Sequence, residues 1–292
     1  AHLYTAKDID KSKKYPAIVI WTPYGWVKEQ WAWIYAQNMA ERWFVAMAFD
    51  ESFNGESGWE PRHTSSPDIF VEDFSAWIDF LGMLDYVDRD KIWVIWICGA
   101  GWFSLTASQV DPRIKAVVTA SMYDISSMHR DGFGKTVTPE QRETTLKNLA
   151  QQRWVDFASW NVQVPAGFPT QPAPVLPEWM DPVLSEFFEY YAMKRWFHPN
   201  AQAAFTTTSL IAFMNFPLMT YISTNTTPKL LIMWENAHSR YYTEEAYEKA
   251  AEPKELYIVP GARHIDLYDG WINWENYIPF DKIETFFKIN LK

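Results

Sequence analysis

The sequence predicts an α/β protein with a mostly parallel central sheet, flanked by helices, that carries a helical insertion. Three observations support this class. Short apolar runs rich in β-branched residues alternate with amphipathic helical segments, which is typical of strand–helix–strand crossovers. The alternation stops at about Ile125 and resumes near Pro228. After the last apolar run comes a polar loop and then a closing amphipathic segment.

The expected strands are continuous apolar runs, as in sheets that are buried on both faces. They are the strand end at Leu3 and Tyr4, followed by Tyr15–Trp21, Trp43–Phe49, Ile92–Ile97, Ile114–Ala120, Lys229–Met233 and Glu255–Val259. The helices expected between and after them are 28–42, Asp68–Leu84, Phe103–Val110, Thr243–Ala251 and Phe280–Asn290. Asp68–Leu84 has the clearest apolar stripe, formed by Phe70, Phe74, Trp77, Ile78 and Leu81.

Residues 125–227 are rich in proline and aromatic residues, with two expected helices, Pro139–Gln152 and Met180–Met193. We therefore expect a core made of residues 1–124 and 228–292 and a mostly helical lid made of residues 125–227. Insertions of this kind often cover active sites, so the lid would shape the pocket for an acyl or a leaving group.

Composition excludes several classes of function. The 292 residues are 48% hydrophobic, enough for a large core, and the net charge of −10 argues against nucleic acid and anionic membranes as partners. The single cysteine excludes an internal disulfide and fits a reducing, cytoplasmic location. A membrane span would need an apolar run of about 18 residues, and the sequence contains none. No metal or cofactor motif is present, and Asn54–Gly58 is interpreted as a turn. The expected partner is a small molecule, and homo-oligomerisation is left open.

The single cysteine stands where a strand is expected to turn into a helix. The stretch Lys91–Leu105 reads KIWVIWICGAGWFSL, with Cys98 at the junction. A nucleophile on a sharp strand-to-helix turn is exposed at the end of a parallel sheet, as in the pattern G-x-nucleophile-x-G. Here the nucleophile would be a thiol, and Trp96 and Ala100 replace the two outer glycines of the pattern. His264 follows the last expected strand, which is the place of the base in that arrangement. Together they predict a thiol nucleophile with a histidine base, because free cysteine needs a base to form thiolate at neutral pH.

Four stretches resemble bacterial α/β-hydrolases of the dienelactone-hydrolase-like and Xaa-Pro-peptidase-like group. They are Pro23–Gly25, Ala48–Asp50 with Gly55–Ser57, Ile97–Gly101 and Val259–Tyr268. The resemblance extends from near residue 1 to residue 292 and implies the α/β-hydrolase fold, here without its usual N-terminal hairpin. It implies an esterase-like hydrolase in which Cys98 and His264 are two members of a Cys-His-Asp triad.

The resemblance also implies an oxyanion hole formed by Tyr24, which follows a proline, and the backbone N–H of Gly99. The expected acid after Met233 is not an aspartate, because the segment reads Trp234-Glu235-Asn236-Ala237-His238. Glu235 is our first candidate for the acid and Asp124 the second. Asp266 is interpreted as a loop-capping residue.

Tryptophan is unusually frequent, with 17 residues against 11 glycines. The resemblance leads us to expect glycine at Trp21, Trp26, Trp43, Trp93, Trp96, Trp102, Trp196 and Trp234. An indole that replaces glycine in a close contact overpacks it, which typically costs about 1–3 kcal/mol. Three explanations are possible: the backbone has shifted, our alignment of the motifs with the chain is off, or the sequence departs from the natural one at these positions. We favour the third. Native tryptophans would predict a distorted elbow and little hydrolysis.

Two functions follow from these features. The first is a hydrolase of an ester, lactone or thioester that forms an acyl-Cys98 intermediate. The second is a catalytically impaired α/β-hydrolase-fold protein that binds a small apolar ligand. A distance of about 3–4 Å from the Cys98 sulfur to a ring nitrogen of His264 would favour the enzyme. A tryptophan ring between them would favour the binding protein.

Overall fold

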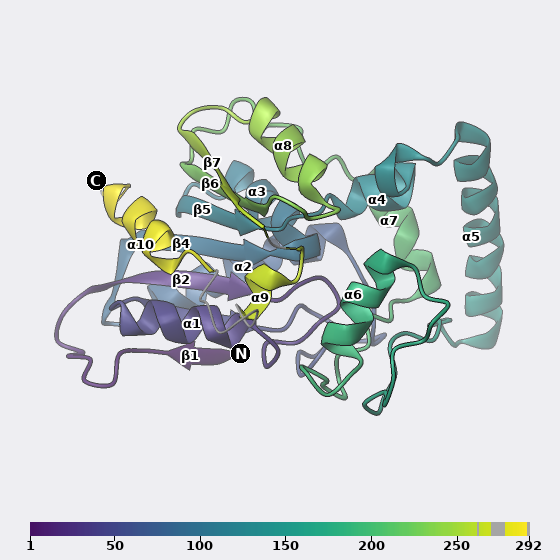
Figure 1. Ribbon diagram of the computed structural model, residues 1–292, viewed down its shortest axis with the longest axis horizontal. Helices are drawn as coiled ribbons and strands as arrows, with labels where there is room; N and C mark the ends of the chain where they lie inside the picture. Colours follow the sequence, from purple (N-terminus) through teal and green to yellow (C-terminus); the bar gives the residue numbers. More distant parts are fainter. Residues whose placement is uncertain (262, 270–277, 291–292) are drawn as a thin grey trace.

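The chain forms a seven-stranded sheet within the residues that the structure, a computed structural model, describes, namely 1–261, 263–269 and 278–290 (Figure 1). The strand order is β1-β3-β2-β4-β5-β6-β7. The strands are β1 (His2–Tyr4), β2 (Tyr15–Trp21), β3 (Val45–Phe49), β4 (Val87–Ile97), β5 (Ile114–Ala120), β6 (Lys229–Trp234) and β7 (Lys254–Val259). Only β1 is antiparallel to its neighbour, with His2 opposite Ala48. The fold class predicted from the sequence is confirmed.

Helices cover both faces of the sheet, which explains why its strands are apolar throughout. The helices of the sheet region are α1 (Ala32–Glu41), α2 (Pro67–Gly82), α3 (Gly101–Val110), α8 (Arg240–Lys249), the short α9 (Asp266–Asp269) and α10 (Phe280–Ile289). α1 packs on β2 and β3 and touches α10, whereas α2 and α3 pack on each other and on the middle strands. Val19, Val94 and Leu231, on three different strands, are completely buried.

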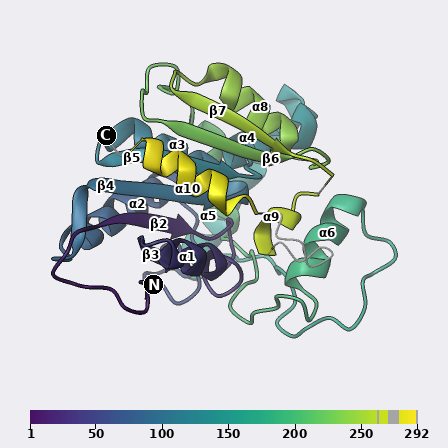
Figure 2. The same ribbon diagram turned by 60° about the vertical axis from the view of Figure 1, so that its left-hand side comes forward.

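Between β5 and β6 the chain forms only helices, turns and loops. The helices there are α4 (Ile125–Asp131), α5 (Pro139–Ser159), α6 (Pro182–Tyr191) and α7 (Leu210–Asn215). α5 and α6 correspond to the two helices predicted from the sequence, although α5 continues to Ser159. α5 stands at the outer edge of the molecule, while α6 lies beside α9 in both views (Figures 1 and 2). No helix in the described part is long and apolar enough to cross a membrane.

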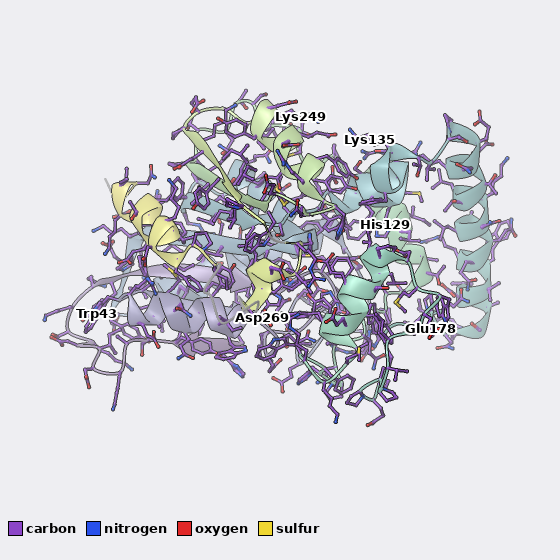
Figure 3. All side chains as sticks on the ribbon, viewed as in Figure 1. Trp43, His129, Lys135, Glu178, Lys249 and Asp269 are labelled. Carbon is purple, nitrogen blue, oxygen red and sulfur yellow. The ribbon has the colours of Figure 1, made fainter. Side chains whose placement is uncertain are left out.

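Most of the tryptophans at expected glycine positions are buried, Trp26 is nearly so, Trp196 is partly buried and Trp43 is exposed. Trp21, Trp93, Trp96, Trp102 and Trp234 are in the core and essentially without exposed surface. The ring centroid of Trp96 lies 4.4 Å from that of Trp21 and 4.9 Å from that of Phe74, in an aromatic cluster between the sheet and α2. Trp43 instead is 52% exposed and has a φ of 69°, a conformation that favours glycine. It lies on the side of the molecule away from α5 and α6 (Figure 3).

Candidate active site

Cys98 lies at a sharp turn between β4 and α3. Ile97 is still extended, with φ −134° and ψ 143°, whereas Cys98 has φ 65° and begins a short 3-10 turn that leads into α3. A positive φ in a residue with a Cβ is strained, and this strain is characteristic of a nucleophile elbow. Cys98 therefore lies on a strained strand-to-helix turn, called the elbow below, with Trp96 and Trp102 buried on either side of it.

The two glycines after Cys98 allow the elbow to approach its neighbours closely. A Cβ on Gly99 would lie 2.8 Å from Cδ1 of Ile125 and 3.1 Å from Cβ of Tyr24. A Cβ on Gly101 would lie 2.3 Å from Cβ of Met122. Larger residues at either position would push the elbow away from the segment that follows β5. The glycines thus keep the Cys98 sulfur and the Gly99 amide next to the loop of Tyr24.

His264 comes from the segment after β7 and faces Cys98. Its Nε2 lies 3.3 Å from Sγ of Cys98 and 2.9 Å from the hydroxyl of Tyr268, one helical turn later. Its Nδ1 lies 2.7 Å from Oγ of Ser239, in the loop after β6. When Nδ1–H donates to Ser239, the lone pair of Nε2 faces the thiol, as a general base requires. Three separate segments thus meet at the carboxyl end of the sheet, where open α/β sheets bind ligands.

The surroundings of the Cys98–His264 pair disfavour the charged form of both groups. Burial raises the pKa of the Cys98 thiol to about 12. Burial, together with the neighbouring His238, lowers the pKa of His264 well below its usual value. Both shifts favour a thiol beside a neutral imidazole over a thiolate–imidazolium pair.

Neither sequence-predicted acid forms a hydrogen bond with His264. Glu235 is exposed, and its carboxylate accepts the backbone N–H of Gly261 at 3.1 Å. Asp124 caps α4 by accepting the N–H of Ser127 at 2.8 Å, and burial raises its pKa to about 6. Within the described residues, the position beside Nδ1 belongs to the Ser239 hydroxyl.

Two more predicted groups lie at the site or near it. Tyr24 lines the same cavity as Cys98 and Gly99, and its hydroxyl lies 2.8 Å from Oγ of Ser65. Asp266 accepts the backbone N–H of Arg263 at 2.6 Å, as a loop cap would. Ala262, which belongs to the same motif as His264, lies outside the described residues.

A cavity of about 480 Å³ opens beside Cys98. Its walls are mostly aromatic and aliphatic, and they come from the loop after β2, from the elbow and from the segment between β5 and β6. The lining residues are Tyr24, Trp26, Cys98, Gly99, Tyr123, Ile125, Met128, Phe133, Phe168, Asp181, Val183, Leu184 and Phe187. Asp181, the one carboxylate in this wall, already caps α6 by accepting two backbone N–H groups. The cavity suits a neutral, apolar group.

Several residues of the site were not found from the sequence. Ser239 is in the loop after β6, close to the expected acid, but a serine in a polar loop carries no signal of its own. Tyr268 follows His264 at a spacing of four, which could have suggested a contact. His238 stacks on His264, with 4.9 Å between ring centroids, and forms a hydrogen bond with Tyr123. Only the folded chain brings these groups together.

A candidate cation site lies away from this centre. His2, Glu29 and Glu56 bring their ligand atoms within 4.8 Å of one another. The ammonium of Lys28 already lies 2.6 Å from the Glu29 carboxylate and 2.7 Å from that of Glu56. The cluster is therefore accounted for by a lysine that its carboxylates neutralise.

Comparison with known proteins identifies similar chains across the whole length. No family model matches the sequence. The uncharacterised protein PA2218 of Pseudomonas aeruginosa is 48% identical over all of this chain and 77% of its own length. YcjY of Escherichia coli, also uncharacterised, is 34% identical over 92% of this chain and 88% of its own. A thiohydrolase of Eupenicillium brefeldianum is 24% identical over 87% of this chain and 81% of its own.

Solved structures agree with these relatives. The crystal structure of PA2218 superposes with a TM-score of 0.92, at 47% identity, over 99% of this chain and 88% of that one. The α/β-hydrolase GrgF of a Penicillium species superposes with a TM-score of 0.74, at 16% identity, over 99% of this chain and 93% of that one. The strand order and these matches lead to one conclusion: the chain has the α/β-hydrolase fold and belongs to the family of PA2218 and YcjY.

Proposed function

We propose that the protein hydrolyses an ester, lactone or thioester through an acyl-Cys98 intermediate, with His264 as the base. The observation that carries this proposal is the 3.3 Å contact between Sγ of Cys98 and Nε2 of His264 at a strained elbow. This distance meets the criterion for a nucleophile and its base, and the two atoms are in direct hydrogen-bond contact, with no indole between them.

In the acylation step, the sulfur of Cys98 attacks the substrate carbonyl carbon while the thiol proton passes to Nε2 of His264. The two events are coupled, because the raised pKa of the thiol keeps free thiolate scarce. The carbonyl oxygen becomes an oxyanion, which the N–H of Gly99 and the hydroxyl of Tyr24 would stabilise. When the intermediate collapses, the bond to the leaving alcohol or thiol breaks, and His264 returns the proton to it.

In the deacylation step, water replaces the leaving group in the cavity. His264 takes a proton from the water as its oxygen attacks the thioester carbon, and the bond to Cys98 then breaks. The proton returns to the sulfur, and the carboxylic acid leaves. Ser239 would fix the tautomer of His264 in both steps, the role of the acid in a triad, but without a negative charge.

The substrate we propose is a small neutral acyl compound with an apolar or aromatic group. Support comes from the aromatic cavity and from the thiohydrolase relative. The pairing of Cys98 with His264 also supports a place near the dienelactone-hydrolase-like and Xaa-Pro-peptidase-like group. We propose residues 125–227 as the lid, because α6 contributes Val183, Leu184 and Phe187 to the cavity wall. A free buried thiol at the reacting centre fits a cytoplasmic enzyme.

The test compares wild-type protein with Cys98→Ala and Cys98→Ser on p-nitrophenyl acyl esters and on the matching acyl thioesters. We expect Cys98→Ala to abolish turnover and labelling by iodoacetamide. Cys98→Ser should lose most of the turnover, since a hydroxyl is harder to deprotonate than a thiol. Unchanged turnover in Cys98→Ala would contradict the mechanism.

Ligand binding without turnover is the second candidate. It is favoured because, among the residues that the structure describes, a hydroxyl rather than a carboxylate lies beside Nδ1 of His264. It predicts saturable binding of an apolar ligand and no release of p-nitrophenol by the wild-type protein.

A further inference from the structure

Glu186 brings a carboxylate from α6 into the base loop, the segment 263–269 that carries His264. Its side chain is only 10% exposed. Oε1 accepts the backbone N–H of Ile265 at 3.0 Å, and Oε2 lies 3.6 Å from Nδ1 of His238. Glu186 thus reaches the peptide group that directly follows the proposed base.

A carboxylate is a costly residue for this position. A buried carboxylate needs hydrogen bonds or a charge partner to offset its desolvation, and an apolar side chain would pack there without this cost. The next residue, Phe187, shows that such packing is available, because its ring lies edge-on to His238 and His264, with centroid distances of 5.6 Å and 5.3 Å. Packing alone therefore does not explain why a carboxylate, with its hydrogen bond to the Ile265 N–H, occupies this position.

The Ile265 N–H is a sensitive point from which to hold the base. The peptide plane between residues 264 and 265 sets where the His264 ring leaves the backbone. The carbonyl of the same peptide group is also bound, because the Ser121 hydroxyl donates to the carbonyl oxygen of His264 at 3.2 Å. Glu186 and Ser121 thus fix both polar groups of one peptide, one from α6 and one from the end of β5.

A second contact connects the residues that follow α6 to the far end of the base loop. The guanidinium of Arg195 lies 2.9 Å from the carboxylate of Asp269, which also accepts the Trp196 indole N–H at 2.7 Å. Asp269 is the last residue of α9, and Figure 3 labels it there. This contact holds the end of the loop, four residues beyond Ile265, whereas Glu186 holds its start.

We propose that Glu186 is a positioning residue, which fixes the base loop through the Ile265 N–H so that His264 faces Cys98 while α6 is docked. The proposal rests on the proposed function, since it gives Glu186 its role through His264. It also assigns a use to α6 beyond lining the cavity: docking of this helix would complete the site.

The charge of Glu186 acts on the same centre. The titratable groups around it are Cys98 on the elbow, Tyr123 after β5, His238 after β6, and His264 and Asp266 in the base loop. The negative charge contributes to the raised pKa of Cys98, Tyr123 and Asp266. A glutamine would remove this charge and keep a carbonyl oxygen for Ile265, so the two roles can be separated.

The experiment compares Glu186→Ala and Glu186→Gln with wild type, and uses Glu189→Ala, an exposed change on the same helix, as the matched control. The readouts are kcat and KM on a p-nitrophenyl ester and hydrogen exchange of the peptide that contains Ile265. For Glu186→Ala we expect kcat to fall about 10-fold or more, because one buried hydrogen bond is lost, with KM within about 2-fold. Exchange at Ile265 should accelerate about 10-fold or more, since the amide loses its acceptor.

Glu186→Gln should restore kcat and exchange to within about 3-fold of wild type, because the carbonyl oxygen remains available as an acceptor. Wild-type kcat in Glu186→Ala, or equal loss in Glu186→Gln and Glu186→Ala, would overturn the proposal. If Glu186→Ala does not fold, Glu186→Met replaces it, with similar volume and no acceptor. Absence of hydrolysis by wild type would instead refute the proposed function, while the exchange measurement would still test the contact with Ile265.

Discussion

Replacing Ser239 with alanine removes the hydrogen-bond partner of Nδ1 and tests how far a neutral hydroxyl does the work of a triad acid. His264 has no exposed surface, so a solvent molecule does not take the place of the lost hydroxyl without rearrangement. When Nδ1–H donates across the 2.7 Å contact to the Ser239 hydroxyl, Nε2 can accept the thiol proton. Alanine should therefore weaken both the orientation of the ring and the stabilisation of the imidazolium that forms during acylation.

The expected size of the effect follows from the charge of the ring. A hydrogen bond between neutral groups contributes about 0.5–1.5 kcal/mol and one to a charged group about 1.5–3 kcal/mol. The bond strengthens as His264 takes the proton, so the transition state should lose about 1–2 kcal/mol more than the ground state, which corresponds to a fall of about 5- to 30-fold in kcat. KM should change little, because Ser239 does not line the cavity. The free energy of unfolding should fall by about 1–3 kcal/mol, since a buried N–H is left unpaired.

The assay is steady-state hydrolysis of a p-nitrophenyl ester, combined with urea unfolding. Ser108→Ala is the matched control, because this serine is also buried and its hydroxyl donates to the carbonyl of Leu105 within α3. The control should keep wild-type kcat. If Ser239→Ala keeps full kcat while its stability falls, Ser239 is a structural residue, and the reasoning about the tautomer of His264 is refuted.

Three further predictions concern the thiol, the oxyanion hole and a tryptophan. The rate of Cys98 alkylation by iodoacetamide should rise about 10-fold per pH unit from pH 6 to 10, because the thiol pKa is about 12 and thiolate increases with pH; a plateau near pH 7 would indicate an ion pair instead. Tyr24→Phe should lower kcat about 100-fold if its hydroxyl stabilises the oxyanion, whereas Ser65→Ala, which removes only its 2.8 Å partner, should keep most of the activity. Trp43→Gly should raise the free energy of unfolding by about 1 kcal/mol in urea titration, because Trp43 has a φ of 69° and is half exposed; a loss of stability would show that its stacking on Tyr15 outweighs the backbone strain.

The fold was predictable because its signals are local and repeated. Runs such as Tyr15–Trp21 and Ile114–Ala120 are apolar on both faces, and only a sheet covered on both sides buries them. The strand-to-helix turn at Cys98 was predictable for a related reason, since the small residues Gly99, Ala100 and Gly101 follow the end of such a run. α4 and α7 were not predicted, because they are short and gain their stability from packing against each other, a contact between residues far apart in sequence.

The site was only partly predictable because its polar contacts connect distant loops. Cys98 and His264 could be paired from their places relative to the strands. The partner of Nδ1 could not, because the loop after β6 offers Glu235, His238 and Ser239 within five residues. Its backbone path decides which of them faces the ring, and it turns Glu235 toward Gly261. The role of Glu186 depends in turn on how α6 docks, which no local pattern specifies.

The proposed thiol nucleophile would explain why a hydroxyl, and not a carboxylate, contacts His264. An alcohol is so weak an acid that its base must gain a positive charge early, and a carboxylate next to the ring stabilises that charge. A thiol is more acidic and more nucleophilic than an alcohol, so its reaction depends less on stabilisation of the imidazolium. In this site a carboxylate near the ring would also oppose the thiolate that forms as the proton leaves. Glu186 keeps its carboxylate off the ring of His264, because it contacts the Ile265 amide and His238, although its charge still contributes to the raised pKa of Cys98. In the described residues, the ring itself forms hydrogen bonds only with the uncharged side chains of Cys98, Ser239 and Tyr268. The proposed mechanism therefore combines neutral contacts to the ring, a carboxylate that holds the backbone next to it, and a thiol that carries the chemistry.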